Sequence, residues 1–296
     1  MLNAKAGRRF LNNAYEGENA FWRYATVISV VVLYWVMFAY YTVVATQAIL
    51  TAFGIHSLIA QMVGDAMPFA IVISWLTFAM PALHERTWQS LINSESTINY
   101  RRVAQGFCVW GSQMVVWAAL AIADNPNDYT FSVSWNWPLL LFLAVLLVPI
   151  QTSAEELLFR GYLMQGLRLI TKQKIWLIAI TGMAFAIPHF GNPEMARGAF
   201  IWGALDYFTW GVLFAAITLK DNGLELALGM HAANNLFLYL FVTTPDAVVT
   251  TPALFLYETQ IDPSFGFLGL LIDGAIFYAV FFGGIPRKRM GDRALN

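Results

Sequence analysis

The chain has 296 residues, of which 58% are hydrophobic and 12% are charged, whereas soluble domains carry about 25% charged residues. This composition excludes an ordinary soluble protein and predicts an all-α, polytopic membrane protein. The formal net charge of −1 gives no reason to expect a nucleic acid partner. The single cysteine, Cys108, excludes an intrachain disulfide bond.

Eight apolar runs are long enough, or nearly so, to cross a bilayer, which takes about 20 helical residues. We expect about eight transmembrane helices in a single integral domain, residues 1–296, with Pro68 and Pro138 near helix starts. The first run lacks a small-residue cleavage site and is expected to be retained as a span. The runs cover residues 25–50, 66–83, 103–123, 138–159, 175–190, 199–219, 223–243 and 265–285.

The basic residues are distributed as expected for loops on one side of a membrane, because cytoplasmic loops carry an excess of Lys and Arg. If the N-terminus is cytoplasmic, all of the 17 basic residues except Arg197 fall in cytoplasmic segments. The eight runs therefore predict an integral, multi-pass protein with both termini in the cytoplasm.

Two adjacent carboxylates, Glu155 and Glu156, follow the apolar run and lie in the membrane or just below it. A charged carboxylate at the bilayer centre costs about 2.5–3.5 kcal/mol, so such a residue indicates function. Glu156 and Arg160 are four residues apart on one helix face, which predicts an ion pair. Glu155 is rotated by about 100° and has no such partner, which makes it the better catalytic candidate. Alternatively, Glu156 and Arg160 only position a helix end.

A helical hairpin is predicted around the turn at residues 171–174. Glu155 and His189 would then lie at the same level, each about 25 Å from the turn. His189 ends an apolar helix, and the alternative for it is a capping or water-facing role. His231 and Asn235 share a face in the seventh run, where hydrogen bonding between helices is the alternative to catalysis. His56 and His84 are expected in loops.

A glutamate, two histidines and an amide would thus meet from three helices inside an apolar bundle. A desolvated glutamate can act as general base on water, and a histidine can orient that water. A second histidine with an amide donor can stabilise an oxyanion, which together would allow attack on a carbonyl. Alternatively, Glu155, His189 and His231 could bind zinc with a water in the open position.

The three segments resemble the signature motifs of the CPBP family, which comprises CAAX proteases and bacteriocin-processing enzymes. The motifs read Glu155-Glu156-x-x-x-Arg160, Phe185-x-x-x-His189 and His231-x-x-x-Asn235. The resemblance covers roughly residues 138–243, which would form the catalytic core on helices four to seven.

This resemblance implies an intramembrane endopeptidase of the type II CAAX prenyl endopeptidase kind. Glu155 and His189 would activate water, His231 and Asn235 would form the oxyanion site, and Glu156 with Arg160 would brace the helix. The family is described both as metalloproteases and as glutamate-type proteases. We expect no metal cofactor, because Asn235 is a poor zinc ligand and no H-E-x-x-H motif is present. If the enzyme uses a metal, Glu155, His189 and His231 are the expected ligands.

The implied partners are the lipid bilayer and a membrane-anchored or membrane-associated protein or peptide substrate, in the plasma membrane of a prokaryote. Prenylation of the substrate is not implied. The alternative function is a noncatalytic membrane scaffold or immunity protein that uses the same polar core. A transporter is less well supported, because broken helices in two inverted halves are not apparent.

Two other acids in apolar runs, Asp206 and Asp273, raise the possibility of an aspartyl intramembrane protease. Such enzymes carry Tyr-Asp and Gly-x-Gly-Asp, whereas here Asp206 precedes Tyr207 and the glycine pattern is missing. We therefore expect both acids to make hydrogen bonds between helices. A rhomboid-type serine protease is also unsupported, because Ser153 lacks a Gly-x-Ser-x-Gly setting.

Overall fold

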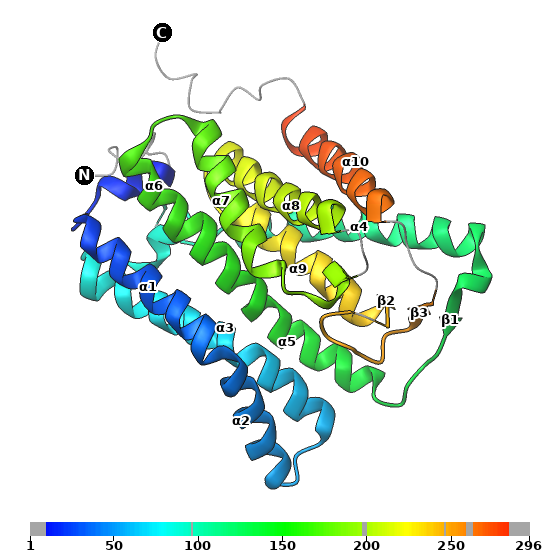
Figure 1. Cartoon of the computed structure of the whole chain (residues 1–296). Helices are drawn as coiled ribbons and strands as arrows, with labels where there is room; N and C mark the ends of the chain where they lie inside the picture. Colours follow the sequence, from blue (N-terminus) through cyan, green and yellow to red (C-terminus); the bar gives the residue numbers. More distant parts are fainter. Residues whose placement is uncertain (1–9, 96, 197–199, 246, 259–262, 284–296) are drawn as a thin grey trace.

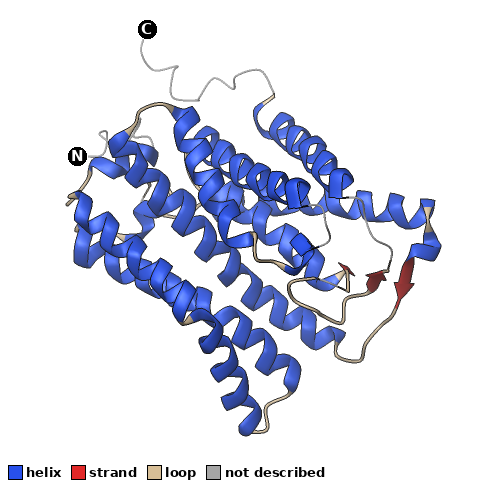
Figure 2. Cartoon of the chain, in the orientation of Figure 1, coloured by secondary structure: helices blue, strands red, loops and turns tan. Residues whose placement is uncertain are grey.

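The computed structural model describes residues 10–95, 97–196, 200–245, 247–258 and 263–283. In these residues the chain forms a helical bundle with one small sheet at one end (Figure 1), and Figure 2 shows how helices dominate. The predicted all-α class is confirmed. The α-helices are α1 (Phe21–Met37), α2 (Ala39–Ala52), α3 (Ser57–His84), α4 (Tyr100–Asp124), α5 (Trp137–Glu156), α6 (Met164–Ile170), α7 (Lys174–His189), α8 (Phe200–Asp221), α9 (Glu225–Leu240) and α10 (Pro263–Phe282).

Shorter elements complete the described chain. A π-helical segment, η4 (Leu157–Leu163), joins α5 to α6 without a break. In the sheet, β3 is central, antiparallel to β1 and parallel to β2. The strands are β1 (Tyr129–Phe131), β2 (Val242–Thr243) and β3 (Phe255–Tyr257), and the 3-10 helices are η1 (Phe10–Tyr15), η2 (Trp88–Leu91), η3 (Pro126–Asp128) and η5 (Pro193–Ala196).

Each predicted run corresponds to a helix or to a pair of consecutive helices, but the helices differ in length. Among the described residues, five are long and apolar enough to cross a membrane: α3, α4, α5 with its continuation to Ile170, α8 and α10. The pair α1 and α2 would make a sixth span if it counts as one. Both α7 and α9 have only 16 residues. The polytopic bundle is confirmed, and the number of eight spans stays a prediction.

The first predicted run is not one straight helix, because α1 and α2 meet at an angle of 57°. The break lies at Phe38, between the two helices. Thr42 Oγ1 donates a hydrogen bond to the Phe38 carbonyl at 3.0 Å, and the Tyr34 hydroxyl donates to Thr42 at 3.2 Å. Such bonding of a threonine hydroxyl to the preceding turn bends helices.

The second run begins earlier than predicted. Helix α3 starts at Ser57, where the His56 ring accepts a hydrogen bond from the Leu58 amide, so Pro68 lies inside the helix and not near its start. Pro138, by contrast, lies in the first turn of α5 as predicted. The prediction of a loop position is wrong for His84, which ends α3 and is fully buried.

The His84 ring joins the end of α3 to two distant segments, which explains its burial. It bonds to the Tyr162 hydroxyl at 2.8 Å and to the Glu18 carbonyl at 2.9 Å. Because both nitrogens of the imidazole are bonded, no polar group of the ring is left unpaired at this buried position.

The predicted hairpin is formed by α6 and α7, with the turn between Ile170 and Lys174. Phe159 and Phe185 lie about equally far from this turn on the two arms, and their rings contact at 5.6 Å. The predicted alignment of the two arms is therefore correct at this level.

The helices around the centre of the bundle approach closely through glycines. A Cβ atom at Gly229 of α9 would overlap the Val103 carbonyl oxygen of α4, and one at Gly211 of α8 would lie 2.6 Å from Gly182 of α7. Close backbone approach of this kind is the usual reason for small residues between membrane helices. The hydrophobic core here includes Trp110, Phe185, Phe214, Ile217, Leu226, Met230 and Phe277.

Arg102, near the start of α4, contacts the ends of two other helices. Arg102 of α4 pairs with Asp221 at the end of α8, at 2.6 Å, and its guanidinium lies over the Phe281 ring of α10, at 4.7 Å. The end of α10 thus lies beside the start of α4. Which side of the membrane this end faces stays a prediction. Outside the described residues lie Lys5, Arg8, Arg9, Arg197, Arg287, Lys288, Arg289 and Arg293.

Candidate active site

The paired glutamates lie where α5 passes into the π-helical segment η4. Glu155 and Glu156 are the last residues of α5, and Arg160 lies in the middle of η4. The predicted ion pair is present, with 3.0 Å between Glu156 Oε1 and Arg160 Nη1 and both side chains fully buried. Isolated π-helical turns occur frequently at functional sites, which draws attention to this segment.

Arg160 is held in an aromatic cage as well as by its acid partner. Its Nη2 donates to the Gly211 carbonyl oxygen at 3.1 Å, and its guanidinium lies 4.4 Å from the Phe185 ring and 4.9 Å from the Phe214 ring. A buried guanidinium over aromatic faces gains from cation–π attraction. The close approach of α7 and α8 at Gly211 brings that carbonyl within reach.

His231 lies between the two glutamates. Its Nδ1 is 2.9 Å from Glu156 Oε1, and its Nε2 is 3.7 Å from Glu155 Oε2. An ionised Glu156, paired with Arg160, can only accept hydrogen bonds, so we assign the proton to His231 Nδ1. In the neutral ring, Nε2 then presents a lone pair toward Glu155. The Phe214 ring stacks on His231 at 4.7 Å and limits its rotation.

Glu155 differs from its neighbour in hydrogen bonding. Glu156 accepts two hydrogen bonds at Oε1 and leaves only its buried Oε2 without a partner, whereas no hydrogen bond to the Glu155 carboxylate is found among the described residues. The Oε2 of Glu155 is buried and has no hydrogen-bond partner among the described residues, and its side chain is 12% exposed. A buried carboxylate oxygen without a partner is rare in proteins and requires an explanation, such as a bound water or a role in the reaction.

His189 belongs to the same cluster through aromatic contacts. Its Nδ1 is 2.7 Å from the Phe185 carbonyl oxygen, which can only accept, and its ring stacks on Tyr207 of α8 at 4.4 Å. The Phe185 ring contacts both histidines, at 4.7 Å from His189 and 6.0 Å from His231. The pairing of His189 with Glu155 that the hairpin predicts stays a prediction, and the structure places His231 Nε2 3.7 Å from Glu155 Oε2.

Asn235 completes the set one helical turn after His231 on α9. It is partly buried, and its Oδ1 accepts a hydrogen bond from Asn234 Nδ2 at 3.2 Å. The side chains of the three predicted motifs therefore come from α5, η4, α7 and α9, and α8 adds Tyr207 and Phe214.

A comparison with known protein families covers this part of the chain. The family model described as type II CAAX prenyl endopeptidase Rce1-like matches residues 134–237, which contain all three motifs. The chain belongs to this Rce1-like family. It is also similar to the uncharacterized protein YyaK of Bacillus subtilis (strain 168), with 35% identity over 257 residues that cover 81% of this chain and 84% of YyaK. Membership confirms the family indicated by the motifs.

The zinc alternative requires that Glu155, His189 and His231 come close enough to bind one metal ion. Among the residues that the structure describes, no three His, Cys, Asp or Glu side chains are grouped so that they could hold a metal ion. Glu155, His189 and His231 therefore do not fit a three-ligand zinc site as they stand. Independence from a metal cofactor stays a prediction.

Several residues near the Rce1-like motifs were not found from the sequence. Asp65 of α3 accepts a hydrogen bond from Gln47 Nε2 at 3.2 Å, and Tyr239 of α9 lies near both Asp65 and Glu155. Asp65 could have been found, because an acid inside an apolar run is itself a signal. Tyr207 and Phe214 carry no such signal, since aromatic residues are common throughout this chain.

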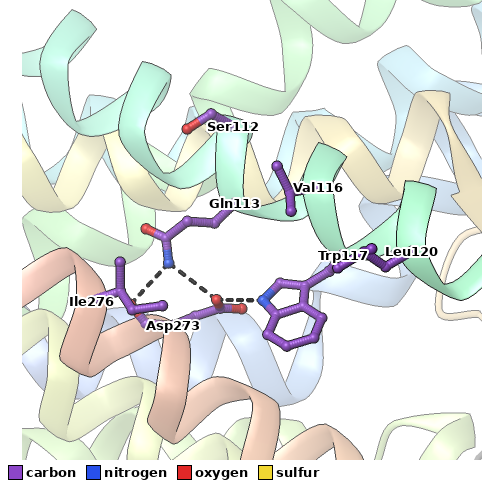
Figure 3. A pocket seen from close by; sticks show the side chains of 7 residues that line it. All are labelled: Ser112, Gln113, Val116, Trp117, Leu120, Asp273 and Ile276. Atoms are coloured by element: carbon purple, nitrogen blue, oxygen red, sulfur yellow. Dashed lines mark hydrogen bonds between the residues drawn. The ribbon is translucent and has the colours of Figure 1, made fainter.

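Asp273 of α10 takes part in a separate arrangement on the surface of the bundle (Figure 3). Its Oδ1 accepts hydrogen bonds from Gln113 Nε2 at 3.1 Å and from Trp117 Nε1 at 2.7 Å, both on α4. The predicted hydrogen bonding between helices is thus confirmed for Asp273. These residues line a shallow pocket together with Ser112, Val116, Leu120 and Ile276, and no motif residue lines it.

Proposed function

We propose that this chain is an intramembrane endopeptidase that hydrolyses a peptide bond in a membrane-anchored or membrane-associated protein or peptide. The observation that carries the proposal is the buried, unpartnered Oε2 of Glu155, 3.7 Å from a His231 nitrogen that presents a lone pair. Membership of the Rce1-like family supports it.

The distance between these two atoms suits one shared water molecule. A water about 2.8 Å from each atom can donate one hydrogen to Glu155 Oε2 and the other to His231 Nε2. Glu156 and Arg160 keep His231 in the tautomer that this arrangement requires. We therefore give His231 the orienting role that the sequence suggested for His189, and we keep His189 as a catalytic candidate within the same cluster.

The proposed reaction uses this chain's side chains alone. Glu155 takes a proton from the water as general base, and the water oxygen attacks the peptide carbonyl carbon. The carbonyl electron pair moves onto oxygen, and the Asn235 amide donates a hydrogen bond to the resulting oxyanion. When the C–N bond breaks, the protonated Glu155 returns its proton to the leaving amine.

The decisive experiment compares new protein N-termini in membranes from cells that express the wild type or Glu155→Gln at equal levels. N-terminal labelling and mass spectrometry are expected to find products that the wild type forms and the variant does not. Glu258→Gln, the same chemical change beside the small sheet, is the matched control and keeps the products.

Two outcomes separate the enzyme from a noncatalytic scaffold or immunity protein. Loss of specific N-termini in Glu155→Gln, with the protein still inserted and folded, supports the endopeptidase. Identical N-termini in both samples, together with full function of Glu155→Gln in cells, would contradict it and leave the polar core a structural role.

A further inference from the structure

Two hydrogen bonds link α4 to Asn235 through its neighbour. Trp110 Nε1 of α4 donates to Asn234 Oδ1 at 3.3 Å, and Asn234 Nδ2 donates to Asn235 Oδ1 at 3.2 Å. Three side chains thus form one chain of hydrogen bonds that ends at a residue of the third motif.

The Trp110 indole fixes the direction of both hydrogen bonds. Trp110 Nε1 can only donate, so the amide oxygen of Asn234 must face it and the amide NH2 must face away. That NH2 group donates, so Asn235 has to present its oxygen to Asn234. Without such a donor, the two orientations of an asparagine amide are hard to tell apart.

The NH2 group of Asn235 is consequently directed away from Asn234. In the part of the chain that the structure describes, no group accepts a hydrogen bond from Asn235 Nδ2. Asn235 lies one turn from His231 on the same face of α9, and the Nε2 of His231 faces Glu155. The Asn235 donor is therefore on the same face of α9 as the His231 ring.

Orientation matters because the two ends of an amide have opposite effects on an oxyanion. The NH2 end stabilises a developing negative charge, whereas a flipped amide would present its oxygen and repel it. A flip of Asn235 would therefore remove a donor and add a repulsion at the same place.

Packing holds the indole in position. Trp110 is 2% exposed, and its ring contacts Trp210 at 5.1 Å and Phe277 at 5.9 Å. The approach of α4 and α9 at Gly229 fixes the spacing between the two helices. A donor on a packed, rigid element can set the geometry of a site more accurately than one on a loop.

We propose that Trp110 and Asn234 are positioning residues that orient the Asn235 amide with its NH2 group toward the oxyanion. This inference rests on the proposed endopeptidase function. The competing explanation is that the two hydrogen bonds only hold α4 and α9 together.

Trp110→Phe tests the proposal, because it removes the N–H and keeps a large aromatic ring. The probe is the substrate whose cleavage depends on Glu155 in the labelling experiment, reconstituted with the enzyme in phosphatidylethanolamine and phosphatidylglycerol vesicles. We expect kcat to fall at least about tenfold with KM nearly unchanged, since loss of a whole oxyanion donor costs about 10²–10³-fold in kcat.

The matched control is Trp137→Phe. The Trp137 indole also donates to α9, to the Leu240 carbonyl oxygen at 3.0 Å, but lies outside the chain of hydrogen bonds to Asn235. The Trp137→Phe variant is expected to keep the wild-type kcat. Asn234→Asp is a second test variant, since a carboxylate accepts from Trp110 and cannot donate to Asn235.

A double-mutant cycle separates positioning from helix attachment. Trp110→Phe should lower kcat in the wild type and have no further effect in Asn235→Ala, measured under single-turnover conditions. An equal loss in both backgrounds, or no loss in the wild type, would overturn the proposal. If Glu155→Gln still cleaves, the proposed function itself has failed, which is a distinct result.

Discussion

Glu156 Oε1 accepts a hydrogen bond from His231 Nδ1 at 2.9 Å, between two side chains that are almost wholly buried. The same oxygen atom accepts from Arg160 at 3.0 Å. One carboxylate therefore balances a buried cation and sets the tautomer of a histidine. Glu155, the preceding residue, has neither task, and no hydrogen bond to its carboxylate is found among the described residues. Adjacent glutamates thus have different environments and should respond differently to the same substitution.

Glu156→Gln is expected to destabilise the protein strongly, and Glu155→Gln hardly at all. The first change leaves Arg160 buried without a counter-charge, which costs about 3–5 kcal/mol. The second removes no hydrogen bond seen among the described residues. Thermal denaturation of the purified variants in detergent measures the difference.

The double variant Glu156→Gln with Arg160→Met is the control for this prediction. Removing the cation along with its partner should restore part of the lost stability, because no unpaired charge is left buried. Equal denaturation temperatures for Glu155→Gln and Glu156→Gln would show that the ion pair is not what stabilises this region.

Gly229→Ala should damage both stability and activity, because α4 and α9 touch at this position. The added Cβ would overlap the Val103 carbonyl oxygen and lie 2.7 Å from the Phe107 backbone nitrogen, both on α4. Gly229 lies two residues before His231 on α9. Forcing packed helices apart costs about 1–3 kcal/mol. Denaturation temperature and cleavage rate are the two measurements.

The matched control is Gly111→Ala on the facing helix. Its Cβ would lie 3.8 Å from the Ala233 Cβ, an ordinary contact, and alanine favours a helix over glycine by about 1 kcal/mol. This variant should be as stable as the wild type or slightly more so. A similar loss in both variants would mean that the interface tolerates no added methyl group anywhere, and that Gly229 is not special.

The sequence predicted the helices and the ion pair between Glu156 and Arg160 well because both depend on local spacing. Glu156 and Arg160 are four residues apart, so their ion pair follows from helix geometry. The ring contact between Phe159 and Phe185 shows that counting residues from a turn aligns two antiparallel helices. These features need no knowledge of how the bundle rotates each helix.

Contacts between helices that are not neighbours along the chain could not be predicted in this way. Spacing shows which residues share a face, but not which neighbouring helix that face meets. Equal depth predicts that Glu155 and His189 lie at one level, but it gives no reason to expect the His231 ring 3.7 Å from Glu155, where the structure places it. The indole of Trp110 was missed for the same reason, since its partner Asn234 is 124 residues away. The bend at Phe38 depends on side-chain bonds that a hydropathy pattern does not contain.

Cleavage should persist in the presence of metal chelators such as EDTA and 1,10-phenanthroline. No group of three His, Cys, Asp or Glu side chains that could hold a metal ion is found among the described residues. The measurement is the rate of cleavage of the Glu155-dependent substrate before and after exhaustive chelation, with a known zinc protease treated in parallel. Loss of activity that added zinc restores would show that the site rearranges to bind metal.

Asp273→Asn should leave cleavage unchanged. The asparagine oxygen can still accept from Trp117 and Gln113, so the link between α4 and α10 in Figure 3 is kept while the acid is lost. Asp273→Leu, by contrast, removes both side-chain hydrogen bonds, each of which contributes about 0.5–1.5 kcal/mol. Denaturation temperature should therefore fall for the leucine variant and not for the asparagine variant.

These two variants also separate aspartyl chemistry from the proposed glutamate chemistry. An aspartyl protease loses its activity when a catalytic aspartate becomes asparagine, whereas the proposed mechanism requires only that α10 stays attached to α4. Cleavage by Asp273→Asn at the wild-type rate, beside an inactive Glu155→Gln, would assign the chemistry to Glu155. An inactive but folded Asp273→Asn would instead place a second essential acid on α10, outside the three motifs.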